Sequence, residues 1–193
     1  MQQQVAKLLP SREGHFIYES GHHGEVWLDL ELLLLHPERV EPLADALADR
    51  LRVHRVAAVC GPLVEGAFVG LMVSSALRLP FSYSEPTRDR PEAGLFPVSY
   101  PIPEPLHAEL RGKRVAIVND VINAGSAVRG TLAALKKCGA QPAAIGALAV
   151  YGEAASKLAA EHALPLETLA CFPSRIWEPS ACPLCAKGVP LHG

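Results

Sequence analysis

At 193 residues the chain is long enough for one substantial core, and two full domains would be a tight fit. Hydrophobic residues make up 49% and charged residues 20%, which is a globular composition, and the formal net charge of −2 argues against a dedicated nucleic-acid-binding protein. No apolar run approaches the roughly 18 residues of a membrane span, the first residues are polar, and the five cysteines are too scattered for a secreted disulfide framework. We therefore expect a cytoplasmic protein with neither membrane nor nucleic-acid partners.

The first 36 residues have a pattern of their own. Residues 2–9 have the composition of a short helix that ends at a proline. Residues 15–18 and 25–30 alternate in polarity on either side of a glycine-bounded turn, which predicts a β-hairpin. We expect residues 1–36 to form a small N-terminal hood, in which His15, His22 and His23 are either solvated or in contact with a substrate.

Strands then alternate with helices through residues 37–175. Helical spacing follows Pro37 as far as Arg52, and helices are predicted again over residues 65–77, 127–138 and 153–162. Buried strands are predicted over residues 56–60, 81–84, 115–118, 145–151 and 166–171. This order predicts an α/β domain with a doubly wound, mainly parallel five-stranded sheet and helices on both faces. Ligands of such sheets lie outside the carboxyl ends of the strands.

Residues 114–130 organise the predicted site. An apolar strand stops at two polar residues, Asn119 and Asp120, and the turn Asn123-Ala124-Gly125-Ser126 leads into a helix, with Ser126 as a candidate N-cap and Gly139 beyond its end. Backbone N–H groups at a helix N-terminus hold phosphate, and a neighbouring carboxylate holds sugar hydroxyls or a metal. A phosphorylated sugar would satisfy both, although an ordinary strand–turn–helix remains the alternative.

A proline-rich excursion interrupts the alternation at residues 85–113. It contains six prolines between Glu85 and Lys113, together with Arg88 and Arg90. Because it leaves from the carboxyl end of a strand, it is either a lid over the site or a proline-stiffened surface loop or hairpin.

Residues 176–193 form a tail with a Cys-x-x-Cys pair, Cys182 and Cys185. The pair supplies two of the four ligands that zinc requires, and the others could come from Cys171, His192 or a second subunit. A reduced, packed pair is the alternative, and a redox pair lacks the strand-to-helix context of thioredoxin-like motifs.

The stretch from Arg114 to Gly130 resembles the phosphoribosyl-pyrophosphate (PRPP) signature of the type I phosphoribosyltransferases. Three other pieces are similar to the orotate branch of that family: Gly14-His15-Phe16 with Ser20-Gly21-His22, Leu33-Leu34-Leu35 with Pro37, and the stretch from Val59 to Gly66. The resemblance covers about residues 14–171. It implies the type I phosphoribosyltransferase fold, a homodimer, and Mg²⁺ carried mainly by PRPP oxygens and water.

The resemblance also implies roles for individual residues. Asp120, with Asn119 beside it, would accept hydrogen bonds from the ribose hydroxyls. The 5′-phosphate would lie on the backbone of Asn123, Ala124, Gly125, Ser126 and Ala127, and pyrophosphate on Gly61, Pro62, Leu63 and Val64. His15, Phe16, Ser20 and His22 would lie on the base side. The reaction would be displacement of pyrophosphate by a base nitrogen, with orotate as the expected base and orotidine 5′-monophosphate as the product, a step of pyrimidine nucleotide biosynthesis.

Three features depart from the family pattern. Asn119 stands where the signature has its first acid, Glu65 stands where the orotate enzymes often have a lysine, and the excursion contains no lysine. Arg88 and Arg90 could supply the missing cations as catalytic residues, because guanidinium binds phosphate bidentately. The departures leave two alternatives open: a regulatory protein that binds PRPP or a nucleotide without turnover, and a phosphoribosyltransferase for another base.

Overall fold

The computed structural model describes residues 1–87, 95 and 98–192. Its main sheet has five strands in the order β4-β3-β5-β6-β7, and all neighbouring strands run parallel. The strands are β3 (Ala58–Pro62), β4 (Phe81–Ser84), β5 (Arg114–Ile122), β6 (Gln141–Tyr151) and β7 (Leu166–Phe172). The five-stranded parallel sheet predicted from the sequence is therefore confirmed.

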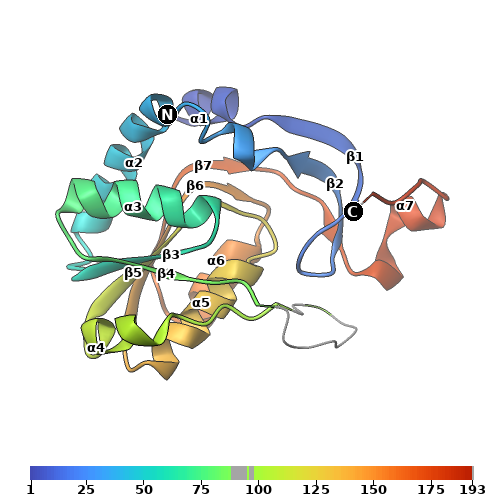
Figure 1. Ribbon diagram of the computed structural model, residues 1–193. Helices are drawn as coiled ribbons and strands as arrows, with labels where there is room; N and C mark the ends of the chain where they lie inside the picture. The colour runs from blue at the N-terminus through green and yellow to red at the C-terminus, as the bar shows by residue number, and fades with distance from the viewer. Residues whose placement is uncertain (88–94, 96–97, 193) are drawn as a thin grey trace.

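Helices cover both faces of this sheet (Figure 1). On one face lie α2 (Pro37–Arg52) and α3 (Glu65–Leu77), and α1 (Gln2–Leu8) packs beside them. On the other face lie α4 (His107–Leu110), α5 (Ser126–Lys137) and α6 (Ala154–Glu161). Successive side chains of a strand point to opposite faces, so β5 serves both cores: Ala116 and Val118 join the first, and Val115 and Ile117 join the second.

The N-terminal hood is a second, antiparallel sheet in the order β1-β2-β8. It pairs β1 (Ser11–Ile17) with β2 (His23–Leu28), as the predicted hairpin requires, and adds β8 (Ile176–Trp177) from the C-terminal tail. The tail continues through a 3-10 turn η3 (Pro179–Ala181) and the short helix α7 (Pro183–Ala186). It returns to β1, where the His192 N–H donates to the His15 carbonyl at 2.8 Å. The tail is thus part of the hood.

Two boundaries near the predicted site differ from the sequence expectation. Strand β5 does not stop before Asn119 but continues to Ile122, because its last residues keep pairing with β6 (Asn119 with Ala147, Ile122 with Val150). Ser126 is the first residue of α5 and not its N-cap. The cap is Gly125, whose φ of +82° belongs to the left-handed region that glycine adopts without strain. Gly139 follows α5 at φ +80°, as predicted.

The described ends of the excursion pair with each other. Thr87 and Ser99 exchange two backbone hydrogen bonds of 2.8 and 3.0 Å, and the Glu85 N–H donates to the Pro101 carbonyl at 2.9 Å. The chain then forms a second 3-10 turn, η2 (Glu104–Leu106), before α4, and Leu110 is buried in the core beneath α5. These ends favour the hairpin interpretation.

Arg88 and Arg90 lie outside the described residues. Among the helices that are described, none has the length and apolar character needed to cross a membrane.

Candidate functional site

The candidate site lies where the winding of the main sheet reverses. From β3 the chain proceeds to β4 on one side, whereas from β5 it proceeds to β6 and β7 on the other. Ladder pairing of β5 with β3 covers Val115 to Ile117, and the pairing of Asn119 to Ile122 is with β6. A crevice at the carboxyl ends of β3 and β5 is the usual ligand site of such sheets.

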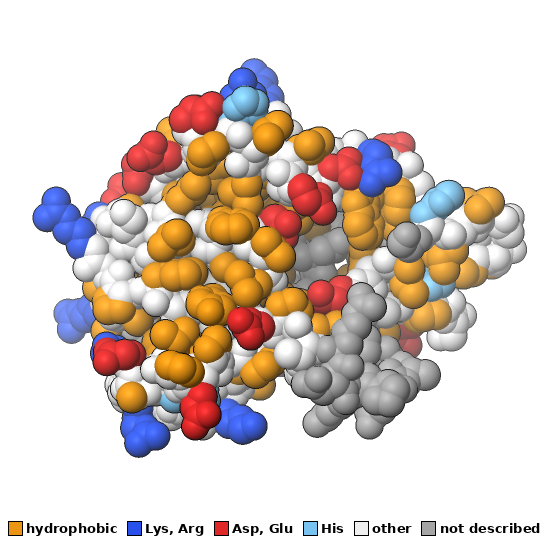
Figure 2. Space-filling model, in the orientation of Figure 1, with side chains coloured by type: hydrophobic (Ala, Val, Ile, Leu, Met, Phe, Trp, Pro, Cys, Tyr) orange, Lys and Arg blue, Asp and Glu red, His pale blue; other side chains and the backbone are white. Residues whose placement is uncertain are grey.

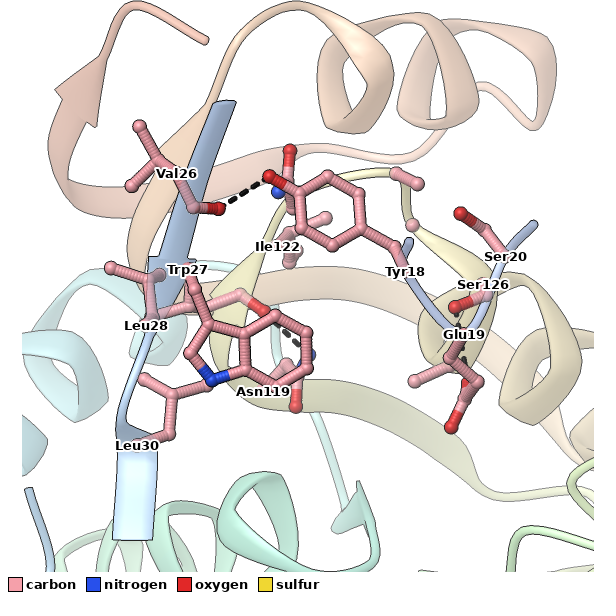
Figure 3. Close-up of a pocket in the computed structure, with 15 residues that line it drawn as sticks. Tyr18, Glu19, Ser20, Val26, Trp27, Leu28, Leu30, Asn119, Ile122 and Ser126 are labelled. Carbon is pink, nitrogen blue, oxygen red and sulfur yellow. Dashed lines mark hydrogen bonds between the residues drawn. The ribbon is translucent and has the colours of Figure 1, made fainter. Parts of the chain in front are cut away.

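A cavity of about 220 Å³ lies between the hood and the end of β5. This is smaller than the roughly 300–1,000 Å³ of a pocket that takes a whole drug-sized ligand, so it fits one part of a larger substrate. Figure 3 shows Tyr18, Trp27 and Asn119 directed into it. The hood contributes Tyr18, Glu19, Ser20, Val26, Trp27, Leu28 and Leu30, and the β5–α5 segment contributes Asn119 and residues 121–127.

The turn into α5 holds an acidic side chain in this structure. The Ser126 hydroxyl donates to Glu19 Oε1 at 3.2 Å, and the Tyr100 hydroxyl donates to the same oxygen. The first amides of α5 are also directed toward this end of the helix, because the first four N–H groups of a helix have no partner within it. The helix dipole favours negative charge here. The turn therefore has the donors and the polarity to hold an anion, and Glu19 is placed where one would bind.

Asp120 is buried inside β5, with 4% of its surface exposed. Within the described residues its Oδ2 atom has no hydrogen-bond partner. Burial raises the pKa of this carboxyl to about 7; a backbone hydrogen bond from Val121 opposes the rise, and the negative charge of Glu65 adds to it. A buried carboxylate oxygen without a donor is costly, and a ligand hydroxyl would relieve that cost.

Asn119 lines the cavity and packs against the start of α3. Its Nδ2 donates to the Val121 carbonyl at 2.9 Å, and its Oδ1 lies over Gly66, where an added Cβ would come within 1.9 Å of it. Gly66 therefore leaves the space that Asn119 occupies, and any larger residue at position 66 would displace the amide.

The end of β3 and the loop after it, residues 61–64, offer a ligand fewer backbone N–H groups than the sequence suggested. Pro62 has no N–H, and the Leu63 N–H donates to the Ser84 carbonyl at 2.8 Å. Gly61 permits close packing on α3, since a Cβ there would lie 2.7 Å from the Gly66 carbonyl oxygen. An anion beside this loop would meet the amides of Val64 and of the first turn of α3. Gly61, Pro62, Leu63 and Val64 do not line the cavity.

On the base side the structure separates the four predicted residues. Ser20 lines the cavity, and its Oγ lies 3.1 Å from His22 Nδ1. Phe16 is buried in the hood against Trp27, with ring centroids 5.6 Å apart. His15, only 1% exposed, faces the tail cysteines instead of the cavity. The expected base contact of His15 is therefore corrected, because both of its ring nitrogens are engaged elsewhere.

Of the hood residues that line the cavity, the sequence predicted only Ser20, and it missed Tyr18, Glu19 and Trp27 among others. The Tyr18 hydroxyl donates to the Val26 carbonyl, and burial raises the pKa of this phenol. The available signal for Tyr18 and Glu19 was their position immediately before Ser20, a residue that the resemblance already placed on the base side.

The chain is similar to known proteins in both sequence and fold. The sequence profile of the phosphoribosyl transferase domain matches residues 33–183. The orotate phosphoribosyltransferase of Pelotomaculum thermopropionicum is 31% identical over 181 residues, which span 92% of this chain and 86% of that protein. The crystal structure of orotate phosphoribosyltransferase from Aeropyrum pernix is similar with a TM-score of 0.64 at 25% identity, over 86% of this chain and 93% of that one.

A purine enzyme shares the fold as well. The adenine phosphoribosyl transferase from Trypanosoma brucei, solved in complex with AMP, pyrophosphate and ribose-5-phosphate, has a TM-score of 0.68 at 15% identity, over 88% of this chain and 78% of that one. At that identity the likeness is one of fold.

Replacing Asp120 by asparagine is expected to stabilise the protein at neutral and alkaline pH. The folded carboxyl titrates near pH 7 and the unfolded one near 3.8, so the folded state holds the proton longer, and the stability of the wild type falls as pH rises through this window. Asp120→Asn removes that fall, which amounts to about 4 kcal/mol at most. Urea unfolding between pH 4 and 8 measures it.

The matched control is Asp45→Asn, which removes an exposed carboxylate on α2. The stability difference between wild type and Asp120→Asn should grow with pH, whereas the difference for Asp45→Asn should stay nearly constant. A pH-independent difference for Asp120→Asn would show that its carboxyl titrates normally.

Proposed function

Because the chain belongs to the phosphoribosyltransferase family, we propose that it transfers the phosphoribosyl group of PRPP to orotate and releases pyrophosphate. The observation that carries this proposal is the buried Asp120 with its unpartnered Oδ2, a few residues before the turn into α5 in the same chain segment. The two features suit the hydroxyls and the 5′-phosphate of one ribose. Orotate is favoured because the curated relatives that cover most of the chain are named orotate phosphoribosyltransferase.

The 5′-phosphate would bind the turn into α5. The amides from Asn123 to Ala127 and the Ser126 hydroxyl supply donors, and Gly125 allows the backbone to approach closely. Glu19 would have to leave Ser126, since its carboxylate and a phosphate dianion repel each other. Glu19 is exposed and belongs to the hood hairpin, so it can leave without disturbing the core.

Asp120 would accept hydrogen bonds from the ribose hydroxyls. In the reaction the bond from the anomeric carbon to a pyrophosphate oxygen breaks, a bond to a base nitrogen forms, and positive charge develops on the ribose ring. The protein's contribution is to hold both reactants in line and to stabilise the departing negative charge. Asp120 fixes the ring from the hydroxyl side, and the α5 turn fixes it at the 5′ end.

The pyrophosphate would lie beside the loop from Gly61 to Val64. With Pro62 lacking an N–H and Leu63 committed to Ser84, its donors would be the Val64 amide and the first amides of α3. Arg88 and Arg90 are proposed to add the positive charge that this end of the site needs, because Glu65 brings a negative one.

Mg²⁺ would fit this site as an ion that binds together with PRPP. Among the described residues, the one cluster of three or more candidate metal-binding side chains is a histidine–cysteine group in the hood, which is soft and unsuited to Mg²⁺. Mg²⁺ would therefore be held mainly by PRPP oxygens and water, with Asp120 as the nearby carboxylate. The ion would supply charge neutralisation of the pyrophosphate.

The base would enter from the hood side of the cavity. Ser20 offers a hydroxyl there, His22 lies next to it, and the Tyr18 and Trp27 rings stack with centroids 6.4 Å apart. Aromatic faces and a few polar groups are what a planar heterocycle requires. Phe16 acts behind Trp27 as support.

A homodimer is proposed from the outer face of α3. Figure 2 shows hydrophobic side chains gathered over this part of the surface. Val64, Phe68 and Leu71 are 51, 47 and 51% exposed and are spaced so that they lie on one side of the helix. A second copy of the chain would cover them.

Calorimetry with PRPP and Mg²⁺, followed by pyrophosphate-release assays with orotate, uracil, adenine and hypoxanthine, tests the proposal. We expect PRPP to bind and pyrophosphate to be released with orotate. Release with another base would change the substrate and keep the reaction. Binding without release for any base would favour a PRPP-binding regulatory module, to which the three carboxylates at the site, Glu19, Glu65 and Asp120, lend some support. Failure to bind PRPP would contradict the proposal.

Glu19→Gln is expected to tighten the binding of ribose 5-phosphate about fivefold, because two unit charges about 4 Å apart in water interact by about 1 kcal/mol. Glutamine keeps an oxygen that accepts from Ser126 and Tyr100, so the fold is preserved. Titration calorimetry measures the affinity. Glu13→Gln, an exposed change in the same hood, is the control and should leave the affinity unchanged. Equal affinities for wild type and Glu19→Gln would place the phosphate elsewhere.

The double variant Arg88→Ala/Arg90→Ala is expected to lower kcat by about 10- to 100-fold, since removing one donor to a developing charge costs on the order of 10² to 10³ in kcat at well-formed sites. The affinity for ribose 5-phosphate, which lacks the pyrophosphate, should not change. Arg39→Ala, on the exposed side of α2, serves as the control for loss of surface charge. Unchanged turnover in the double variant would remove both arginines from the mechanism.

A further inference from the structure

We propose that His15, His23, Cys182 and Cys185 form a structural zinc site that ties the C-terminal tail to the hood. Their candidate ligand atoms all lie within 4.8 Å of one another. The two histidines come from β1 and β2, and the two cysteines come from the turn before α7 and from α7 itself. The site is separate from the β5–α5 cavity, and it does not depend on the proposed reaction.

The distances match the spacing that zinc imposes. A tetrahedral zinc, with Zn–N of about 2.0–2.1 Å and Zn–S of about 2.3 Å, holds two nitrogens about 3.3–3.4 Å apart and a nitrogen and a sulfur about 3.5 Å apart. Here His15 Nε2 and His23 Nδ1 are 3.3 Å apart. The nitrogen-to-sulfur distances are 3.3 Å for Cys182 with His15, 3.8 Å for Cys185 with His15, and 3.3 Å for Cys185 with His23.

The surroundings prepare His15 to bind a metal. Its Nδ1 lies 2.8 Å from the Val189 carbonyl oxygen, so Nδ1 carries the proton and Nε2 presents a lone pair to the cluster. Such a contact behind a histidine ligand is the usual way in which its tautomer and ring orientation are fixed. Val189 belongs to the tail, so the residue that orients the ligand comes from the same segment as the cysteines.

The cysteine pair sits in a tight turn. The Ala186 N–H donates to the Cys182 carbonyl at 3.2 Å, and the Gly188 N–H donates to the Cys185 carbonyl at 2.9 Å. Gly188 has a φ of +68°, which closes the turn. The result is a Cys-x-x-Cys knuckle that points both sulfurs at the two imidazoles.

The composition of the cluster selects zinc. Two imidazoles and two thiolates in a tetrahedral arrangement suit zinc, whereas Mg²⁺ and Ca²⁺ take oxygen ligands. All four positions are filled by protein, which is characteristic of structural and not catalytic zinc. His15, His23 and Cys182 are at most 5% exposed, so the site is closed to solvent except on the side of Cys185.

The other two candidates for ligands are placed elsewhere. Cys171 is exposed on β7 and is not part of the cluster, and His192 lies against Phe16, with ring centroids 6.0 Å apart. A single chain therefore supplies a complete set, and no second subunit is needed.

A bound zinc would hold the hairpin whose tip faces the cavity. His15 and His23 flank the turn that carries Tyr18, Glu19 and Ser20, so fixing both histidines fixes both ends of that turn. Because the unfolded chain does not hold the four ligands together, the binding free energy also stabilises the hood.

The test is metal analysis of the full chain purified under reducing conditions without chelators. We expect about one zinc per chain for the wild type and less than about 0.1 for Cys185→Ser, since three ligands hold structural zinc far more weakly than four. Cys185 is exposed, so its replacement by serine should leave the fold intact. Cys171→Ser, also an exposed cysteine, is the control and should keep its zinc.

Two further measurements keep the proposal falsifiable if Cys185→Ser does not fold. Wild type reloaded with Co²⁺ must show thiolate-to-cobalt charge-transfer absorption, and chelation must speed amide hydrogen exchange in β1 and β2 while leaving α6 unchanged. Wild type that contains no zinc and takes up none when zinc is added would overturn the proposal. A Cys182–Cys185 disulfide in protein purified without reductant, persisting when zinc is present, would overturn it as well.

Discussion

Strand β5 carries a carboxylate, Asp120, between two hydrophobic cores, and no donor among the described residues satisfies its Oδ2 atom. Burying a charged carboxylate without a donor destabilises the folded state. For the same reason, burial raises the pKa of Asp120 to about 7. The fold tolerates it because β5 is the central strand and is held by β3 at one end and by β6 along most of its length. A ligand that donates hydroxyls to Asp120 would remove the cost, which is why we propose this carboxyl as the group that recognises the ribose.

Three glycines near β5 allow the chain to pack closely around this central strand. Gly66 leaves room for Asn119, Gly61 lets the loop after β3 approach α3, and Gly125 turns the chain out of β5 and into α5. Each brings backbone amides or polar side chains to the same edge of the sheet. Over this edge lies the hood, which is built from both ends of the chain because β8 adds to β2 and His192 returns to β1. The hairpin β1–β2 and the C-terminal tail therefore lie side by side in one small antiparallel sheet (Figure 1).

Much of this arrangement could be predicted from local sequence patterns. The periodicity of Val115 to Val118 predicted the strand, and the small-residue turn after it predicted the passage into α5. What failed were features decided by tertiary contacts. Polar residues suggested that β5 ends at Val118, yet the ladder with β6 carries it through Asn119 and Asp120. For the tail cysteines, the sequence offered Cys171, His192 or a second subunit as the further zinc ligands. It is the hairpin fold of the hood that brings His15 and His23 together beside Cys182 and Cys185.

The proposed site has more negative charge than a site for a phosphorylated sugar would be expected to have. Glu19 accepts a hydrogen bond from Ser126 at the turn into α5, Glu65 is the first residue of α3 after the loop that follows β3, and Asp120 is buried in β5. The proposed site therefore has three carboxylates around a polyanionic substrate. They are not equivalent. Asp120 is buried, and burial raises its pKa to about 7. Glu65 interacts favourably with the N-terminus of its own helix, and Glu19 is exposed on a hairpin. Only Glu19 can withdraw at little cost. It accepts hydrogen bonds from Ser126 and Tyr100. Under the proposed function, its departure from Ser126 would couple the hood to phosphate binding.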